Sequence, residues 1–252
     1  MAIIGSKIYQ TETCNNSLKW AKEFLQEAPD GAIFLANKLS FARGRQKRVW
    51  SIFAGQLMVT ILLKPEDLKK EEHLSPHLNS LNMALSLGIL EPIKKYGAKL
   101  KWPNDFIVQN KKLGGMIMEL VWQEARPKGI ILGFALNINN IFVPQDSLFP
   151  IATSLTMLTK KFVDKENLFQ QIISTLDLWY QLWMKKKFDK IYEEWKEQQL
   201  YQGQVLSVHH KDGTVVSGIV HKFCNNGDII LETSFGNNKR IPFYIIEEVC
   251  SV

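Results

Sequence analysis

Four cationic side chains surround one glycine in the segment "FARGRQKRVW", residues 41–50, which ends in a tryptophan. The four cations are Arg43, Arg45, Lys47 and Arg48. The planar arginine side chains suit paired hydrogen bonds to phosphate or carboxylate oxygens. Gly44 allows the backbone to approach a ligand closely, and Trp50 offers a ring face on which a nucleotide base can stack. Taken alone, the segment fits a solvated basic loop or a nucleic-acid patch as well as a small-ligand site.

A second candidate is "KWPND", in which a lysine and a tryptophan precede a proline. Because proline disfavours helical backbone in the residue before it, Trp102 should be extended and Lys101 should lie at the end of a strand. A lysine fixed there could stabilise a carboxylate or a phosphate. Asn104 and Asp105 are ordinary turn residues, which is their simpler interpretation. Asp105 could also contact a Mg²⁺ ion or an incoming amine.

Small residues interrupt two further apolar segments, "KLGGMIMEL" and "GFALNIN". Gly114 and Gly115 weaken a strand unless a ligand lies against the backbone or the strand contains a bulge, and both explanations stay open. Gly133 and Ala135 leave room beside a buried strand. Asn137 lies in an apolar run and needs a hydrogen-bonding partner if it is buried. Its amide could contact phosphate or sugar oxygens.

Strands and helices must hold these residues in place. The predicted strands are 6–11, 32–36 and 56–63, and the predicted helices follow residue 17, span 74–89 and occupy most of 162–195. The helix over 74–89 has one apolar face, which should cover a sheet. Strands mixed with covering helices predict an α+β fold with a mixed sheet.

The chain changes character after about Tyr201. Short apolar runs are separated there by three hairpin signals, Asp212-Gly213, Asn226-Gly227 and Gly236-Asn237. Several strands in so short a segment predict a small SH3-like β-barrel. We therefore divide the chain into a domain of residues 1–200 and a C-terminal β domain of residues 201–252.

The composition narrows the class of protein. The 252 residues are 46% hydrophobic and 22% charged, as in a globular protein with a sizeable core. The net charge of +6 favours acidic partners without choosing among them. The three cysteines have no CxxC spacing and the histidines no ligand spacing, so we expect neither a disulfide framework nor a metal-binding site. No segment reads as a signal peptide or a membrane span, so we expect a cytoplasmic protein without a membrane partner.

The order of the segments is more specific than any one of them. The chain carries in succession "TETCNNS", "FARGRQKRVW", "LKWPNDFIVQNKKLGGMIMEL", "GFALNIN" and "ATSL", followed by the small β domain. In this order it resembles the biotin protein ligases from end to end, and the pairing of "KWPND" with "KLGG" is specific to that family. The resemblance implies a class II synthetase-like catalytic domain with mixed sheet, followed by an SH3-like domain.

The resemblance also implies a reaction. Members of the family activate biotin with ATP and Mg²⁺ to biotinyl-5′-AMP, releasing pyrophosphate. They then pass the biotinyl group to one lysine of a biotin carboxyl carrier domain, typically that of acetyl-CoA carboxylase. Helical patterning begins soon after Met1, so we expect a monofunctional enzyme that lacks an N-terminal DNA-binding domain and does not bind DNA. Assembly into a homodimer is left open.

By position, the resemblance assigns roles to individual residues. The residues implied for biotin are Thr13, Cys14, Asn15, Arg43, Gly44, Arg45, Lys101, Gly115, Gly133 and Ala135. Those implied for ATP are Arg43, Arg45, Arg48, Trp50, Lys101 and Asn137. Lys101 and Arg45 are the implied catalytic residues, because the carboxylate of biotin and the α-phosphate of ATP repel each other unless cations lie between them. Asp105 and Lys112 are assigned to the acceptor or to Mg²⁺. The arginine loop is expected to shield the acyl adenylate from water.

The chain departs from the family pattern at several positions. Ala42 and Lys47 stand where the arginine loop usually has glycine, and Ala135 stands at a second glycine position. Leu39 occupies the place of a glutamine that bonds biotin. If the family needs those glycines because the backbone has a positive φ there, the loop must take another path in this chain. The affinity for biotin or the retention of the adenylate would then change.

Three other interpretations remain open. A lipoate or octanoate ligase or transferase shares the fold and a lysine-centred site, but its relatives should lack the full set of segments. A basic nucleic-acid-binding protein would use the arginine loop and the small barrel, which has few aromatic candidates and no RNA-binding signature. A non-catalytic biotin-binding relative would explain the departures. Activation of labelled biotin, lipoate or octanoate with ATP separates these interpretations.

Overall fold

The computed structural model describes residues 2–45, 48–69, 74–124, 126–234, 236–242 and 245–251. The strands of the larger part are β1 (Ile8–Cys14), β2 (Ala32–Leu39), β3 (Gln56–Leu63), β4 (Lys99–Lys101), β5 (Asp105–Val108), β6 (Lys111–Gln123) and β7 (Arg126–Asn137). Its helices are α1 (Ser17–Glu23), α2 (Leu74–Leu90), α3 (Leu155–Thr159), α4 (Lys165–Met184), α5 (Phe188–Glu197) and the short 3-10 helices η2 (Glu66–Lys69) and η4 (Glu91–Tyr96). The C-terminal strands are β8 (Val205–His210), β9 (Val215–Phe223), β10 (Ile229–Glu232), β11 (Asn238–Ile241) and β12 (Ile246–Ser251).

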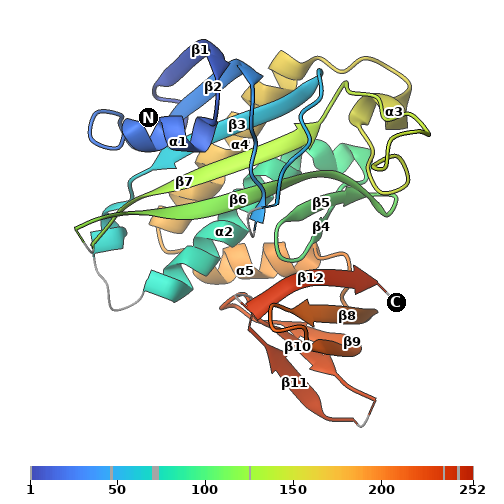
Figure 1. Ribbon diagram of the computed structural model, residues 1–252. Helices are drawn as coiled ribbons and strands as arrows, with labels where there is room; N and C mark the ends of the chain where they lie inside the picture. The colour runs from blue at the N-terminus through green and yellow to red at the C-terminus, as the bar shows by residue number, and fades with distance from the viewer. Residues whose placement is uncertain are drawn as a thin grey trace.

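Seven strands form one mixed sheet in the order β1-β2-β3-β7-β6-β5-β4 (Figure 1). The pair β1 and β2 is parallel, and the other neighbours are antiparallel. This confirms the predicted α+β fold with a mixed sheet. The strands β3, β7 and β6 lie at its centre, so they place their side chains beside both the loop that follows β2 and the turn that precedes β5.

Helices cover both faces of the sheet. The consecutive residues Ile61 and Leu62 are both fully buried, although neighbouring side chains of a strand point to opposite faces. Ile61 belongs to the large core under α2 and α4, whereas Leu62 belongs to a smaller cluster with α1 (Figure 1). The apolar face predicted for α2 is buried at Leu81, Leu85 and Ile89. Each such side chain stabilises the fold by about 1.5–3 kcal/mol.

Most of the expected elements are confirmed, with shifted ends. The first strand spans Ile8–Cys14 rather than 6–11, and β2 continues to Leu39. The helical region predicted over 162–195 is divided into α4 and α5, because Lys186 between them has a φ of 56°, which a helix cannot continue through. None of the helices in the described residues is long and apolar enough to cross a lipid bilayer.

The C-terminal strands form a second, antiparallel sheet in the order β11-β10-β9-β8-β12. Gly213, Gly227 and Gly236 lie in the predicted hairpin turns, and each has the positive φ that favours glycine there. This confirms a small β domain after α5. Within the described residues β11 and β12 are the edge strands of this sheet and do not pair with each other.

The C-terminal sheet packs directly against the "KWPND" turn. The indole nitrogen of the buried Trp102 donates a hydrogen bond of 2.9 Å to the carbonyl oxygen of Gly227. The Asn79 side chain of α2 donates to the carbonyl oxygen of the adjoining Asn226. The residues on either side of Trp102 therefore have a fixed position relative to both sheets.

Candidate active site

The arginine segment folds back on itself directly after β2. Arg43 and Val49 form an antiparallel bridge, and the Trp50 amide donates to the Ala42 carbonyl at 2.9 Å. The Gly44 amide donates to the Arg48 carbonyl at 2.8 Å. Lys47 lies outside the described residues. The described ends of the loop are thus held as a hairpin above the sheet.

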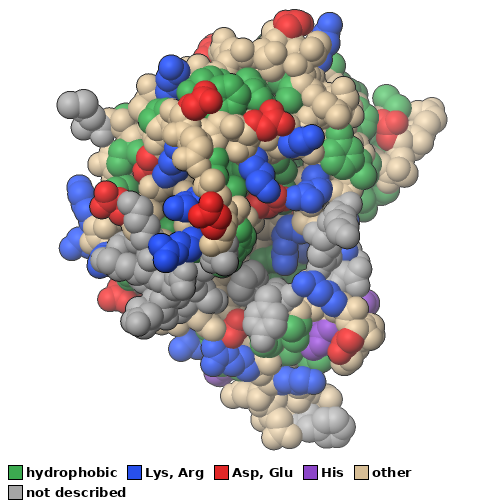
Figure 2. Space-filling view, turned by 60° about the vertical axis from the view of Figure 1, so that its left-hand side comes forward, with side chains coloured by type: hydrophobic (Ala, Val, Ile, Leu, Met, Phe, Trp, Pro, Cys, Tyr) green, Lys and Arg blue, Asp and Glu red, His purple; other side chains and the backbone are tan. Residues whose placement is uncertain are grey.

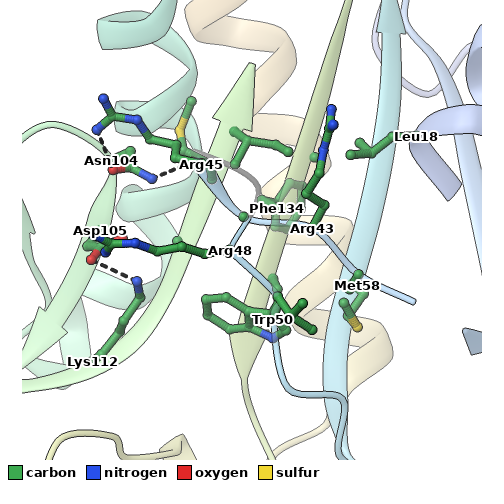
Figure 3. A pocket seen from close by; sticks show the side chains of 18 of the residues that line it. Leu18, Arg43, Arg45, Arg48, Trp50, Met58, Asn104, Asp105, Lys112 and Phe134 are labelled. Atoms are coloured by element: carbon green, nitrogen blue, oxygen red, sulfur yellow. Dashed lines mark hydrogen bonds and ion pairs between the residues drawn. The ribbon is translucent and has the colours of Figure 1, made fainter. Parts of the chain in front are cut away.

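This hairpin roofs a cavity of about 240 Å³ (Figure 3). The predicted site residues that line it are Arg43, Gly44, Arg45, Arg48, Trp50, Lys101, Asp105, Lys112, Gly115, Gly133 and Ala135. Arg45 and Lys101 come from segments far apart in the sequence and share this one cavity. In the space-filling view, Lys and Arg side chains gather on the face above the C-terminal sheet (Figure 2).

A second cavity of about 520 Å³ shares part of its wall with the first. The predicted residues common to both are Arg48, Trp50, Lys101, Asp105 and Lys112. Asn137 lines only the second cavity. Two ligands bound in the two cavities would therefore meet at the same cations.

The cations of the first cavity differ in their partners. Arg43 forms an ion pair with Glu119 of β6, and Lys112 pairs with Asp105 at 2.8 Å. Arg45 instead donates to the neutral amide oxygen of Asn104 at 3.2 Å (Figure 3). The ammonium group of Lys101 lies 6.0 Å from the ring centroid of Tyr201, at the limit of a cation–π contact. Arg45 and Lys101 are thus the cations best able to receive an anionic ligand.

The charge on Arg45 is held in a poorly solvated position. Burial lowers the pKa of the Arg45 guanidinium from its ordinary value, the nearby Asp105 carboxylate opposes that shift, and Arg48 adds to it. Removing a cation from water is costly unless an anion lies beside it. An anionic ligand in the cavity would provide that compensation.

Asn104, which the sequence analysis treats only as a turn residue, lines the first cavity. Its side chain donates to the Met116 carbonyl at 2.7 Å, and the Met116 amide donates to the Asn104 carbonyl at 3.0 Å. The turn is therefore fastened to β6, and the amide oxygen that remains holds Arg45. The sequence identifies Asn104 as a turn residue, but it does not show the bond to Arg45, which lies 59 residues away in the chain.

Trp50 separates the two cavities. The Lys112 ammonium lies 5.3 Å from the centroid of its ring, a cation–π contact. The buried indole nitrogen of Trp50 has no hydrogen-bond partner in the described structure. Lys112 therefore lies against one face of the ring, and the indole N–H is buried without an acceptor among the described residues.

The glycines lie where side chains would collide. A Cβ atom on Gly115 would lie 2.9 Å from the Asp105 carboxylate, and one on Gly114 would lie 2.4 Å from the Ala135 carbonyl oxygen. The β5–β6 register also shifts beside them, between Phe106 and Ile107. Gly115 thus permits the close approach of the Asp105 carboxylate, Gly114 permits that of β7, and the strand is irregular beside both; the ligand explanation stays a prediction.

The departures from the family pattern leave the backbone ordinary. Neither Ala42 nor Ala135 has a positive φ, and neither do Gly44 and Gly133. Ala42 lies in the loop hairpin and Ala135 pairs with Gly115 across the sheet. The described part of the loop therefore needs no glycine-specific conformation at these positions.

Three predicted residues do not line either cavity, namely Thr13, Cys14 and Asn15. The carbonyl groups of Cys14 and Asn15 accept from the amides at the start of the arginine loop. The chain then turns, Asn16 caps α1 by accepting from the Lys19 amide at 3.0 Å, and Ser17 faces the first cavity. The cavity wall thus includes Asn16 and Ser17, directly after the three predicted residues, whose contact with a ligand stays a prediction.

Asn137 has the buried partners that its position requires. Its side chain is 3% exposed and accepts from the Gln56 side chain at 2.9 Å. Its own amide group lies 3.5 Å from the Lys112 carbonyl oxygen.

The described residues contain no group of three or more His, Cys, Asp or Glu side chains that could hold a metal ion.

Comparisons with known proteins point to one family. Residues 7–137 match the profile of the biotin/lipoate A/B protein ligase family. The chain is 28% identical to the bifunctional ligase/repressor BirA of Bacillus subtilis over 94% of its length and 73% of that protein. It is 24% identical to the biotin–[acetyl-CoA-carboxylase] ligase of Mycobacterium tuberculosis over 81% of its length and 74% of that protein.

Solved structures share the fold. The biotin protein ligase from Aquifex aeolicus, in complex with biotin and ATP, superimposes with a TM-score of 0.82, at 22% identity over 98% of this chain and 100% of the other. The family match covers the whole arginine loop, the "KWPND" turn and both glycine-containing strands. The sequence resemblance is confirmed, and the chain belongs to the biotin/lipoate A/B protein ligase family.

Proposed function

We propose that this protein is a biotin protein ligase, which activates biotin with ATP and transfers the biotinyl group to a lysine of a carboxyl carrier protein. The observation that carries the proposal is the convergence of Arg45 and Lys101 on one cavity that adjoins a second, larger one. A small acid in the first cavity and a nucleotide in the second would meet at the shared wall. The relative from Mycobacterium tuberculosis, a biotin–[acetyl-CoA-carboxylase] ligase by name, favours biotin as the acid.

In the first step a carboxylate oxygen of biotin attacks the α-phosphorus of ATP. The new oxygen–phosphorus bond forms as the bond to the β-phosphate oxygen breaks, and pyrophosphate leaves. Two anions approach each other, so fixed cations lower the barrier. Lys101 lies on both cavities and is suited to contact the carboxylate and the α-phosphate together. Arg45, held by Asn104, would neutralise the phosphate on the opposite side.

In the second step the carrier lysine, as a neutral amine, attacks the acyl carbon of the adenylate. The amide bond forms, AMP leaves, and the amine loses a proton. Until the carrier arrives, the adenylate must be kept from water. The hairpin formed by the arginine loop lies across the cavity and would supply that cover.

Trp50 and Asn137 would bind the nucleotide. The Trp50 ring forms the wall between the cavities and can stack on adenine, an interaction of about 1–3 kcal/mol per base. Asn137 lies on the second cavity with its carbonyl oxygen already bonded to Gln56. Its amide group, which lies 3.5 Å from the Lys112 carbonyl oxygen, would use its second proton for a phosphate or ribose oxygen.

Mg²⁺ would accompany ATP rather than occupy a protein site of its own. The ion usually keeps several waters and binds one or two carboxylates together with substrate phosphates. Asp105 is a carboxylate on the wall shared by both cavities, and it now pairs with Lys112. One carboxylate fits a Mg²⁺ ion that is held mainly by the triphosphate. The ion would help to neutralise the charge of the triphosphate.

The decisive experiment compares acids in the first step. The purified protein is incubated with ATP, Mg²⁺ and biotin, lipoate or octanoate, and pyrophosphate release is measured before and after a carrier domain is added. We expect release with biotin and transfer of biotin to the carrier. Release with lipoate or octanoate alone would favour a lipoate or octanoate ligase, and release with none of the three would refute a ligase function.

A further inference from the structure

The two arginines on either side of Gly44 have partners of different charge. Arg43 forms an ion pair with the carboxylate of Glu119, whereas Arg45 donates to the neutral amide oxygen of Asn104. Figure 3 shows the two arginine side chains leaving the loop in different directions. The charge of Arg43 is therefore matched by a carboxylate of the protein itself, while the hydrogen-bond partner of Arg45 carries no charge.

Glu119 stands beside the first cavity without lining it. It follows Ile117 by two residues on β6, in a stretch where the pairing with β7 is regular. Because alternate residues of a strand point to the same face, the two side chains lie on one face of the sheet. Ile117 lines the first cavity, whereas Glu119 lines neither cavity. Any effect of Glu119 on a ligand must therefore pass through Arg43.

The ion pair fastens the arginine loop on the far side of the first cavity. The loop leaves the sheet after β2, and β3 and β7 separate β2 from β6 in the strand order. Residues of β3, β7 and β6 line the cavity, among them Met58, Phe134 and Met116. The bond from Arg43 to Glu119 thus reaches from the loop to the third strand beyond β2, and it connects the loop to the sheet across the cavity.

We propose that Glu119 is a positioning residue, which acts through Arg43 to hold the arginine loop over the first cavity. The ion pair between these two residues is called the loop latch below. Both of its groups belong to the protein, so the latch needs no ligand to form. Its role in retaining the adenylate rests on the proposed function, whereas its role in holding the loop does not. Arg45 is then left to receive the ligand.

The latch is weak enough to open during a reaction cycle. The side chains of Arg43 and Glu119 are 38% and 35% exposed, so water screens their attraction. A pair of this kind should shift the equilibrium between the closed and the open loop by about 1.5- to 5-fold. Salt should weaken it further, because the Debye length falls from about 10 Å at about 0.1 M salt to about 3 Å at about 1 M.

The first test needs no substrate. Trypsin is added to the intact, ligand-free protein, and cleavage after Arg45 and Arg48 is followed by mass spectrometry. We expect Glu119→Gln to raise the initial cleavage rate by about 1.5- to 5-fold at low salt, and high salt should remove the difference from the wild type. Arg43→Gln should have the same effect. The double substitution should add nothing, because either change alone removes the latch.

A matched control lies on the other side of the sheet. Glu12 of β1 faces Lys38 of β2 in an exposed ion pair, and neither residue lines a cavity. Glu12→Gln removes the same charge beside the strand that leads into the loop, and it should leave the cleavage rate unchanged. A wild-type cleavage rate in Glu119→Gln, additive effects in the double variant, or an equal increase in Glu12→Gln would overturn the latch.

The second test follows the adenylate. The protein is loaded with labelled biotin and ATP and freed from unbound ligand, and escape of the labelled adenylate is measured after excess unlabelled biotin is added. We expect escape from Glu119→Gln to be about 1.5- to 5-fold faster than from the wild type, with an unchanged single-turnover rate of pyrophosphate release. Unchanged escape, or slower pyrophosphate release, would overturn the positioning role. A wild type that forms no adenylate would instead refute the proposed function, and the trypsin experiment would still decide the latch.

Discussion

Replacing Lys101 by alanine should remove the cation on which both substrates converge. The neighbouring Lys99 provides a matched control, because residues two apart on a strand point to the same side, and Lys99 is exposed and lines neither cavity. Lys101 is partly buried and lines both cavities. The two substitutions remove the same charge from the same strand but only one removes it from the site.

The expected loss follows from the charge and its position. Two unit charges about 4 Å apart attract by about 4 kcal/mol at an effective dielectric constant of about 20. Because Lys101 is partly exposed, water screens some of this attraction. Loss of one electrostatic donor in comparable sites costs about 2.7–4 kcal/mol, which is about 10²–10³ in rate. We therefore expect Lys101→Ala to lower biotin-dependent pyrophosphate release by that factor, and Lys101→Arg to lose less.

The measurement is the steady-state rate of pyrophosphate release over a range of biotin and ATP concentrations. If Lys101 acts on the transition state, kcat falls, whereas a rise in KM alone would indicate ordinary substrate binding. Lys99→Ala should retain the wild-type rate. A wild-type rate in Lys101→Ala, or an equal loss in Lys99→Ala, would refute the proposal that Lys101 contacts both substrates where the two cavities adjoin.

Three further outcomes are expected. Arg45→Gly should let the adenylate escape, so that biotin labels an unrelated protein mixed with the carrier; label on the carrier alone would contradict this. Gly115→Ala brings a Cβ atom to 2.9 Å from the Asp105 carboxylate, and the displaced carboxylate should lower kcat/KM by about tenfold in the pyrophosphate assay, so unchanged kinetics would count against it. Burial raises the pKa of Asp30, while its hydrogen bonds to Lys64 and Tyr180 oppose the shift. The folded protein therefore binds the Asp30 proton more tightly than the unfolded chain does, and this contribution to stability is lost as the pH rises above about 4. Relative to Asp30→Asn, the wild type should lose unfolding free energy between acidic and neutral pH in denaturant titrations, and parallel profiles would disprove it.

The sequence was sufficient to predict most of the helices and strands because their patterns are local. The run from Gln56 to Leu63 is apolar on both faces, and the Asn226-Gly227 pair requires a turn whatever surrounds it. The convergence of Arg45 and Lys101 could be expected only through the resemblance, because no local pattern relates the two segments.

The details of the site depend on tertiary contacts that no local pattern contains. The alternation along β3 predicts that Thr60 lies on one face of the sheet, but not that this face borders a cavity. The first helix begins where the sequence predicts it, but the cavity wall starts at Asn16 and Ser17 rather than at Thr13, which the local pattern does not reveal. Asn104 was correctly seen as a turn residue, yet its bond to Arg45 depends on how the loop folds over the sheet.

The bond from Trp102 to Gly227 has a consequence for protein engineering. The C-terminal sheet cannot be exchanged for another small β domain simply by matching the linker, because a substitute must present a carbonyl group at the same point in space. Without one, a buried indole N–H would lack an acceptor, which costs about 1–3 kcal/mol. That penalty would fall on the residue next to Lys101, so a graft that folds well could still be a poor catalyst.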